Sequence, residues 1–332
     1  MSLSQFTLLR PRDLAEALAM IDRHAGLGAT RVLAGGTDLL PSMRQKLFEP
    51  EYLLDIRRLN ELTGIRETEE GIEIGALTTL REIEHSSLVG ERCPVLTEAA
   101  RKVASPVIRN MATIGGNISL DTRCLWYNQS FAWRKSCGFC IKKDGDLCHV
   151  APGGRKCWAA FSGDTPAALL CLEAQIGIAS AAGSRGIPLG EFYTGEGDNY
   201  RKLAANEILT KVTLPRASWG YQGIYSKLRI RGSIDYPLAG VAVALKRSNN
   251  HIEDVKVALT AVLPAPVLVP GLDYLARDGN LDEHRAEYAG RLAARTAKPL
   301  TTSALTPEYR REMVRVFTKR ALLALAGRCG RR

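Results

Sequence analysis

The sequence predicts an α+β fold, in which alternating helices and strands are followed by an antiparallel sheet with covering helices. The first observation is that helix-like and strand-like patterns alternate up to residue 215. The second is a change at Trp219, after which three runs of alternating apolar residues predict antiparallel strands. The third is the stretch from Asp121 to Cys157, which has neither period and cannot bury an apolar face of its own.

The first domain is expected to cover residues 1–60. Residues 13–25 place apolar side chains on one helical face, and Asp13 is a suitable N-cap. A short strand at 31–34, a helix at 39–46 and a strand at 52–56 then predict a small βαβ unit.

The second domain is expected to cover residues 61–218. It begins with a strand-like run at 71–80, followed by helices at 80–85 and 94–103 and a turn at 115–117. After the cysteine-rich stretch, Asp164 is expected to cap a helix that has Pro166 in its first turn. Strands at 175–180 and 208–214 complete this domain.

The third domain is expected to cover residues 219–332. Its three alternating runs are GIYSKLRIR, PLAGVAVALKR and IEDVKVALTAVL, and helices near 282–297 and 307–326 are expected to cover one face of the sheet. Residues 327–332 are expected to form a frayed end.

Composition excludes several classes of protein. The net charge of +10 is spread along the 332 residues, which indicates solvated faces or docking surfaces rather than a nucleic-acid interface. No run of 18 uncharged apolar residues is present, so no membrane span is expected. The beginning of the chain has no apolar signal segment, which predicts a cytoplasmic protein, and in a reducing compartment clustered cysteines are metal ligands more often than disulfides.

Two glycine pairs are candidates for binding an anion. Gly35 and Gly36 lie between a predicted strand and a predicted helix, and Gly115 and Gly116 follow a threonine in a similar way. Successive glycine amides can form an anion-binding nest, and two nests in one chain would suit a diphosphate held from two sides. Each pair can also be a tight turn and nothing more. Neither pair belongs to a GxGxxG or GxxxxGK[ST] motif, which disfavours a Rossmann NAD site and an NTPase.

Five of the eight cysteines lie within the stretch from Asp121 to Cys157. Only Cys137 and Cys140 form a C-x₂-C pair, which departs from the spacing of zinc ribbons. Four thiolates spread over a long loop suit an iron–sulfur cluster, although structural zinc is the alternative. The histidines are widely separated and form no nucleophile–base pair, so no catalytic residue is predicted on this chain. His149, next to Cys148, is a candidate for a hydrogen bond beside the cluster.

Several segments resemble the FAD-binding medium subunits of the xanthine oxidase family. They are LAGGTDLLP at 33–41, ATIGGN at 112–117, SGDTPAALLCLEA at 162–174, EILTKVTLP at 207–215 and YSKLRIRGSIDYPLAGVAVAL at 225–245. The resemblance covers nearly the whole chain. It implies a two-part FAD-binding domain of the PCMH type, a C-terminal α+β domain, and an iron–sulfur loop inserted at 121–160.

The inserted loop resembles that of the β subunits of 4-hydroxybenzoyl-CoA reductases. The shared sequence segments are DTRC, YNQS and GDLCHV, and the last of these ends at Val150. The resemblance implies that Cys124, Cys140, Cys148 and Cys157 are the ligands of a 4Fe–4S cluster, and that Cys137 is a spare thiol.

The resemblance also implies flavin contacts. They fall on Arg31, Val32, Leu33, Ala34, Gly35, Gly36, Thr37, Asp38, Val103, Thr113, Ile114, Gly115, Gly116, Asn117, Asp164, Leu209 and Lys227. Lys227 would stabilise a reduced, anionic flavin, and Asp164 would bind ribose or ribityl hydroxyls. The alternatives are a surface lysine at a strand end and a simple helix cap.

The assembly implied by this resemblance is a dimer of heterotrimers. A large subunit would hold the molybdopterin cofactor and a small subunit two 2Fe–2S clusters. Electrons from ferredoxin would pass through this chain to reduce 4-hydroxybenzoyl-CoA to benzoyl-CoA. Five basic residues beside the cluster, which are Arg123, Arg134, Lys135, Lys142 and Lys143, would attract an acidic ferredoxin, or would only be solvated. The alternatives are the medium subunit of a molybdenum aldehyde or N-heterocycle oxidoreductase, and a zinc-stabilised docking module.

Overall fold

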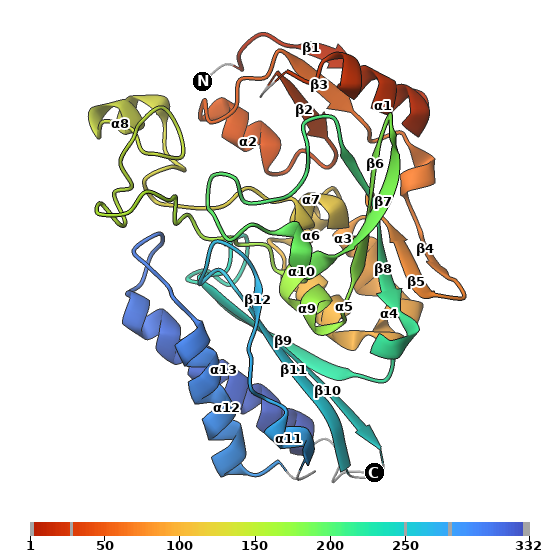
Figure 1. Ribbon diagram of the computed structural model, residues 1–332, viewed down its shortest axis with the longest axis vertical. Helices are drawn as coiled ribbons and strands as arrows, with labels where there is room; N and C mark the ends of the chain where they lie inside the picture. The colour runs from red at the N-terminus through yellow and green to blue at the C-terminus, as the bar shows by residue number, and fades with distance from the viewer. Residues whose placement is uncertain (1–2, 27–28, 249–250, 278–280, 328–332) are drawn as a thin grey trace.

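The computed structural model describes residues 3–26, 29–248, 251–277 and 281–327 and confirms the predicted mixed α and β fold. Three sheets follow one another in space, with the N-terminal sheet, the central sheet and the C-terminal sheet in chain order (Figure 1). In the described part of the chain, no helix is long and apolar enough to cross a membrane. The expected frayed end at 327–332 lies outside the described residues beyond Gly327.

The N-terminal sheet is parallel, with strand order β1-β3-β2. Its elements are β1 (Thr7–Leu9), α1 (Leu14–Arg23), β2 (Thr30–Leu33), α2 (Leu39–Arg44) and β3 (Tyr52–Asp55). Asp13 caps α1 by accepting a hydrogen bond from the amide of Glu16, as its position predicted. The expected βαβ unit is therefore confirmed, and β1 adds a third strand that its three residues were too short to indicate.

The central sheet is antiparallel, with strand order β4-β5-β8-β6-β7. Its strands are β4 (Ile65–Glu67), β5 (Gly71–Gly75), β6 (Gln175–Ser180), β7 (Gly183–Pro188) and β8 (Ile208–Pro215). The helices of this region are α3 (Leu80–His85), α4 (Ser87–Arg92), α5 (Pro94–Arg101), α6 (Pro106–Arg109), α7 (Ile114–Ile118), α9 (Thr165–Cys171) and α10 (Leu189–Phe192). The 3₁₀ helices η1 (Asn60–Leu62) and η2 (Arg216–Ser218) lie at its two ends in the sequence. The turn expected at 115–117 is wrong, because these residues form the first turn of α7.

The C-terminal sheet is antiparallel, with strand order β12-β11-β10-β9, as the alternating runs predicted. Its elements are β9 (Gln222–Leu228), β10 (Ala239–Ser248), β11 (His251–Thr260), β12 (Val267–Leu268), α11 (Tyr274–Arg277), α12 (Glu283–Thr296) and α13 (Pro307–Gly327). Residues of β10 alternate between two cores: Val241 and Val243 face the helices α12 and α13, whereas Ala242 and Ala244 join the core of the central region. The sheet is therefore covered on both faces, and its small alanines allow close approach of α9 (Figure 1).

The cysteine-rich stretch forms a lobe beside α2, and its one helix is α8 (Phe131–Ser136) (Figure 1). Arg134 connects this lobe to the N-terminal part of the chain through a hydrogen bond. Its side chain is only 1% exposed, lies near the rings of Phe131 and Phe139, and donates to the carbonyl oxygen of Lys46 at 2.9 Å. The lobe is also connected to the C-terminal part of the chain, because the amide of Leu125 donates a hydrogen bond to the carbonyl oxygen of Thr302.

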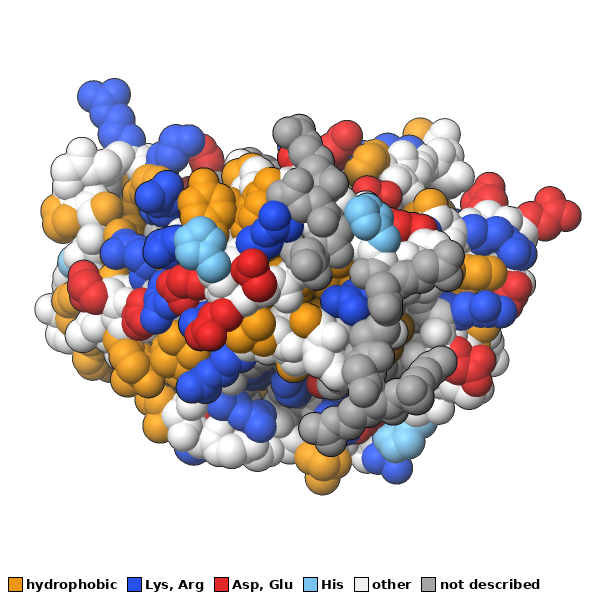
Figure 2. Space-filling model, turned by 90° about the horizontal axis from the view of Figure 1, so that it is seen from below, with side chains coloured by type: hydrophobic (Ala, Val, Ile, Leu, Met, Phe, Trp, Pro, Cys, Tyr) orange, Lys and Arg blue, Asp and Glu red, His pale blue; other side chains and the backbone are white. Residues whose placement is uncertain are grey.

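Charged side chains of both signs lie on one face of the molecule. On the face seen from the end where α11 lies, Lys and Arg side chains alternate with Asp and Glu side chains (Figure 2). This distribution on the visible face agrees with the expectation that the net charge of +10 reflects solvated faces.

Candidate functional site

The first glycine segment connects β2 to α2. Gly36 has a φ of +70°, a conformation that glycine adopts without strain. Among the described residues, no acceptor takes a hydrogen bond from the amides of Gly35, Gly36, Thr37 or Asp38. Four successive amides that are not used within the protein can bind an anion, so this segment fits the expected nest.

The second glycine segment differs. The amide of Gly115 donates to the carbonyl oxygen of Ala76 at 2.9 Å, and the amide of Gly116 donates to the Thr113 hydroxyl at 3.1 Å. The amides of Ile114 and Asn117 are also used, by carbonyl oxygens of the same region. The expectation of a second nest built from free amides is therefore corrected. Contact of residues 113–117 with a flavin stays a prediction.

The two segments lie against each other. A Cβ atom on Gly35 would be 2.0 Å from the carbonyl oxygen of Met111, which is two residues before Thr113. The structure thus brings residues 31–38 and 113–117 together, as the expectation of a shared ligand required. The guanidinium of Arg31 lies 4.2 Å from the centre of the Phe48 ring and faces the cysteine lobe.

Asp164 and Lys227 bind each other in the interior. Lys227 Nζ lies 3.0 Å from Asp164 Oδ2 and 2.9 Å from the carbonyl oxygen of Lys102, and both side chains are at most 3% exposed. The Tyr225 hydroxyl donates to Asp164 Oδ1 at 2.8 Å. Burial raises the pKa of Asp164, while the Lys227 ammonium and the Tyr225 hydroxyl act in the opposite direction. The sequence reasoning missed Tyr225, although Tyr225 and Lys227 are two residues apart in β9 and therefore share a face.

This pair corrects two expectations. Asp164 does not cap α9, because its side chain accepts no capping bond. Asn117 serves that end of α9 instead, through bonds from the amide and the hydroxyl of Thr165 at 3.0 and 2.7 Å. Lys227 is buried in this pair and is therefore not a surface lysine at a strand end, whereas its contact with a flavin stays a prediction. The remaining predicted contacts, Val103 and Leu209, are both buried in the core of the central region.

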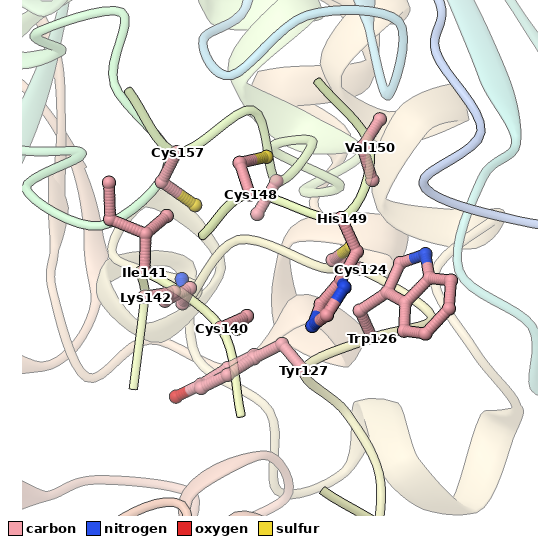
Figure 3. A pocket seen from close by; sticks show the side chains of 11 residues that line it. Cys124, Trp126, Tyr127, Cys140, Ile141, Lys142, Cys148, His149, Val150 and Cys157 are labelled. Carbon is pink, nitrogen blue, oxygen red and sulfur yellow. The ribbon is translucent and has the colours of Figure 1, made fainter. Parts of the chain in front are cut away.

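Four cysteines line one small cavity. Cys124, Cys140, Cys148 and Cys157 are each at most 9% exposed and surround the cavity together with Trp126, Tyr127, Ile141, Lys142, His149, Val150 and Ala159 (Figure 3). Cys137 follows α8 as its C-cap, is partly exposed and does not line this cavity. The structure therefore brings together the four cysteines that the resemblance selected and leaves out the fifth.

Irregular backbone lets the four cysteines converge. Gly138 and Phe139 have φ values of +78° and +60°, and they turn the chain between α8 and Cys140. His149 Nε2 bonds to the carbonyl oxygen of Phe139 at 2.5 Å, and its ring stacks on Trp126 with centroids 4.4 Å apart. Strained backbone of this kind is found at functional sites.

Burial changes the pKa of two of the cavity's thiols. Burial raises the pKa of Cys124 to about 11 and that of Cys157 to about 12. The Lys142 charge acts on Cys157 in the opposite direction. No three His, Cys, Asp or Glu side chains of the described residues lie close enough together to hold a single metal ion.

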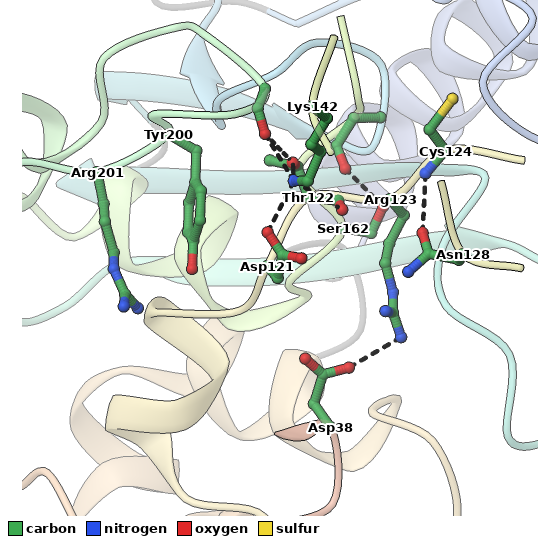
Figure 4. A network of polar contacts seen from close by, with 12 residues as sticks. Asp38, Asp121, Thr122, Arg123, Cys124, Asn128, Lys142, Ser162, Tyr200 and Arg201 are labelled. Carbon is green, nitrogen blue, oxygen red and sulfur yellow. Dashed lines mark hydrogen bonds and ion pairs between the residues drawn. The ribbon is translucent and has the colours of Figure 1, made fainter. Parts of the chain in front are cut away.

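A buried polar layer lies beside the cavity (Figure 4). Lys142 Nζ contacts Asp121 Oδ1 at 2.7 Å and the carbonyl oxygen of Gly197 at 2.7 Å, and it also bonds to the Thr122 hydroxyl. Arg123 Nη2 binds Asp38 Oδ1 at 2.8 Å, and the Tyr236 hydroxyl donates to the same oxygen at 2.7 Å. Asp38 of the first glycine segment is thus held by the cysteine lobe and by the loop before β10.

This layer corrects the expectation of a basic surface around the cluster. The side chains of Arg123, Arg134 and Lys142 are only 20%, 1% and 5% exposed. Lys135 and Lys143 are the two of the five that face solvent more openly. The sequence pattern could not distinguish them, because the partners of the buried three are distant in the sequence.

Comparisons with known proteins agree with this geometry. Residues 4–217 match the family described as FAD binding domain in molybdopterin dehydrogenase, and residues 224–325 match the CO dehydrogenase flavoprotein C-terminal domain. The chain is 29% identical to the glyceraldehyde dehydrogenase medium chain of Sulfolobus acidocaldarius, over 97% of this chain and 99% of the relative. It is also 29% identical to the carbon monoxide dehydrogenase medium chain of Hydrogenophaga pseudoflava, over 98% of both.

A solved structure of carbon monoxide dehydrogenase from Hydrogenophaga pseudoflava has a similar fold. The TM-score is 0.78 at 28% identity, and the similarity covers 98% of both chains. The family match spans well over half of the sequence, from residue 4 to residue 217. The chain therefore belongs to the family of FAD-binding domains of molybdopterin dehydrogenases and is an FAD-binding medium subunit of the xanthine oxidase type.

Proposed function

We propose that this chain is the electron-transfer subunit of a molybdenum-containing oxidoreductase, and that it holds a 4Fe–4S cluster in addition to FAD. The observation that carries the proposal is the buried cavity lined by Cys124, Cys140, Cys148 and Cys157, next to the flavin loops. When bound, the two groups would pass electrons between a donor or acceptor and the molybdenum centre. The chain's own residues would bind them, orient them and exclude water.

For FAD, the first glycine segment is the strongest candidate. The free amides from Gly35 to Asp38 would bind the diphosphate, and the hydrogen bonds of Arg123 and Tyr236 to Asp38 would fix the shape of the segment. The other predicted contacts, among them Arg31, Val103, residues 113–117, Asp164, Leu209 and Lys227, are part of this proposal.

For the cluster, the cavity has the right ligands and walls. Its four thiols come from one lobe, and apolar side chains surround them. A single zinc ion needs its ligands close together, whereas a cluster gives each of four irons one thiolate and so holds them farther apart. We prefer the cluster to zinc because four thiols, one for each iron, line the cavity.

The relatives favour oxidation of a small substrate. The names of similar proteins include glyceraldehyde dehydrogenase, carbon monoxide dehydrogenase and nicotine 6-hydroxylase. We therefore propose an aldehyde, carbon monoxide or an N-heterocycle as the substrate, in preference to 4-hydroxybenzoyl-CoA. The second candidate, reduction of 4-hydroxybenzoyl-CoA with ferredoxin as donor, is favoured by the cysteine lobe alone. In either case, we propose a large molybdenum subunit and a small 2Fe–2S subunit as partners, in a dimer of heterotrimers.

We also propose three domains, at residues 1–60, 61–218 and 219–332. The three separate sheets support this division. The cysteine lobe at 121–160 would then be an insertion in the second domain that contacts both neighbours.

Two matched cysteine variants test the proposed cluster. Cys140→Ser removes one wall of the cavity and should abolish the iron content of the purified protein while FAD stays bound. Cys137→Ser is the control, because Cys137 does not line the cavity and its loss should leave iron unchanged. Full iron in Cys140→Ser, or zinc in place of iron in the unaltered protein, would contradict the proposal.

The substrate is tested on the copurified complex. Activity with aldehydes, carbon monoxide or N-heterocycles and an artificial acceptor would support the first candidate. Dithionite-driven reduction of 4-hydroxybenzoyl-CoA, without activity on the other substrates, would support the second.

A further inference from the structure

We propose that the buried ammonium of Lys142 raises the midpoint potential of the cluster held by the four cysteines. The proposal rests on the proposed function, because it needs the cluster. It goes further by assigning a task to a residue that neither binds iron nor faces solvent.

The Lys142 amino group lies among hydrogen-bond acceptors. Its side chain is 5% exposed, and Nζ contacts Asp121 Oδ1, the Thr122 carbonyl and hydroxyl oxygens and the Gly197 carbonyl oxygen. An ammonium group has three donors and no acceptor, so this ring of acceptors suits its charged form. Nζ also lies 4.6 Å from the centre of the Tyr127 ring and 5.5 Å from that of Tyr200, which adds cation–π attraction.

Only the positive partner of the Lys142–Asp121 pair lines the cavity. Lys142 lines the cysteine cavity, whereas its carboxylate partner Asp121 does not. The positive end of the Lys142–Asp121 pair is therefore the end at the cavity.

Lys142 also reaches a ligand through Gly197. The amide of Gly197 donates to the carbonyl oxygen of Cys157 at 2.9 Å, and a Cβ on Gly197 would lie 2.8 Å from Cys157 Sγ. Because Nζ binds the carbonyl oxygen of this glycine, Lys142 fixes the segment that covers the Cys157 sulfur.

The effect on the potential follows from charge. Reduction adds one negative charge to a cluster, and a nearby buried cation stabilises the reduced form, because low polarisability strengthens the attraction. A tenfold change in the equilibrium of a one-electron couple corresponds to about 59 mV. We expect Lys142→Met to make reduction at least tenfold less favourable and to lower the midpoint potential by about 59 mV or more.

The neighbouring lysine provides the control. Lys143 is 37% exposed and pairs with Asp144, which is equally exposed. Solvent screens such a charge, so Lys143→Met should shift the potential by much less. Lys142→Arg keeps the positive charge, so its midpoint potential should stay close to that of the unaltered protein.

The experiment is a redox titration of the whole complex followed by electron paramagnetic resonance, with iron and FAD contents measured first. An unaltered complex with no iron beyond that of the small subunit's 2Fe–2S clusters would overturn the proposed function and this inference together. Lys142→Met with full iron and an unchanged potential would overturn the inference alone. If Lys142→Met does not retain iron, Asp121→Asn tests the inference instead. Loss of the negative charge of Asp121 should raise the midpoint potential of the cluster. An unchanged potential in this variant would overturn the inference.

Discussion

The two glycine segments have similar sequences, but their backbone amides are used differently. In the segment from Gly35 to Asp38, the amides are free among the described residues, and Gly36 adopts a left-handed conformation. In the segment from Thr113 to Asn117, the glycines begin a helix and their amides are bonded within the protein. A glycine pair therefore indicates a close approach, and the neighbouring residues decide whether a ligand or another part of the chain approaches.

The largest effect is expected from Gly35→Ala. The new Cβ would lie 2.0 Å from the carbonyl oxygen of Met111, which is backbone and cannot rotate away. We expect a loss of about 3 kcal/mol in the free energy of unfolding, together with loss of FAD, because the two segments must separate. Denaturant unfolding and the FAD content per chain measure both. Gly186→Ala is the control, since its nearest atom is 4.0 Å away, and a Gly35→Ala protein as stable as this control would contradict the close approach.

Gly115→Ala should have a smaller effect. Its Cβ would meet Cβ and the carbonyl oxygen of Ala76, both at 2.9 Å, so α7 must shift slightly. We expect a loss of about 2 kcal/mol in the free energy of unfolding. A larger loss of FAD than in Gly35→Ala would mean that the second segment, and not the first, is the main flavin contact.

Thr113→Ala separates the roles of the two threonines. The Thr113 hydroxyl accepts the amide of Gly116 and caps α7, so its removal should cost about 1 kcal/mol of stability, and Thr113→Ser should restore most of it. The Thr37 hydroxyl makes no hydrogen bond among the described residues, so Thr37→Ala should leave the unfolding midpoint unchanged. Equal destabilisation by both variants would show that the segments are more alike than the structure indicates.

Among the glycine variants, Gly116→Val is expected to change stability least. Gly116 is exposed, and its Cβ would meet only the Thr113 hydroxyl, at 3.1 Å. The free energy of unfolding should change by less than about 1 kcal/mol, because valine and glycine differ little in helix propensity. FAD affinity should nevertheless fall, since the side chain would stand where the flavin is proposed to bind. Normal FAD affinity would remove the second segment from the proposed site.

Much of the fold could be predicted because it depends on local patterns. Helix α3 and strand β6 begin and end at the predicted residues, and the three long strands of the C-terminal sheet follow their alternation. Strands β1, β4, β7 and β12 were missed, because β1, β4 and β12 have only two or three residues each and the exposed β7 has no apolar alternation.

The site was harder to predict because its contacts are distant in the sequence. The four cysteines that line the cavity were selected by resemblance, and spacing alone left zinc open. The pairing of Asp164 with Lys227 joins residues 63 positions apart, and no local pattern reports it. The burial of Lys142 depends likewise on Asp121 and Gly197, so the expectation that this lysine is exposed, either to attract a ferredoxin or to be solvated, is wrong.

The two bonds to Asp38 also bear on the order of folding. Arg123 is 85 residues away in the sequence and Tyr236 is 198 residues away. Contacts between such distant residues form late, because the long intervening chain must first lose its conformational freedom. We therefore expect the first glycine segment to reach its final shape only after the cysteine lobe and the strands β9 and β10 are in place. A nascent chain that ends before Tyr236 should bind FAD poorly, which makes cofactor insertion one of the last events in the maturation of this subunit.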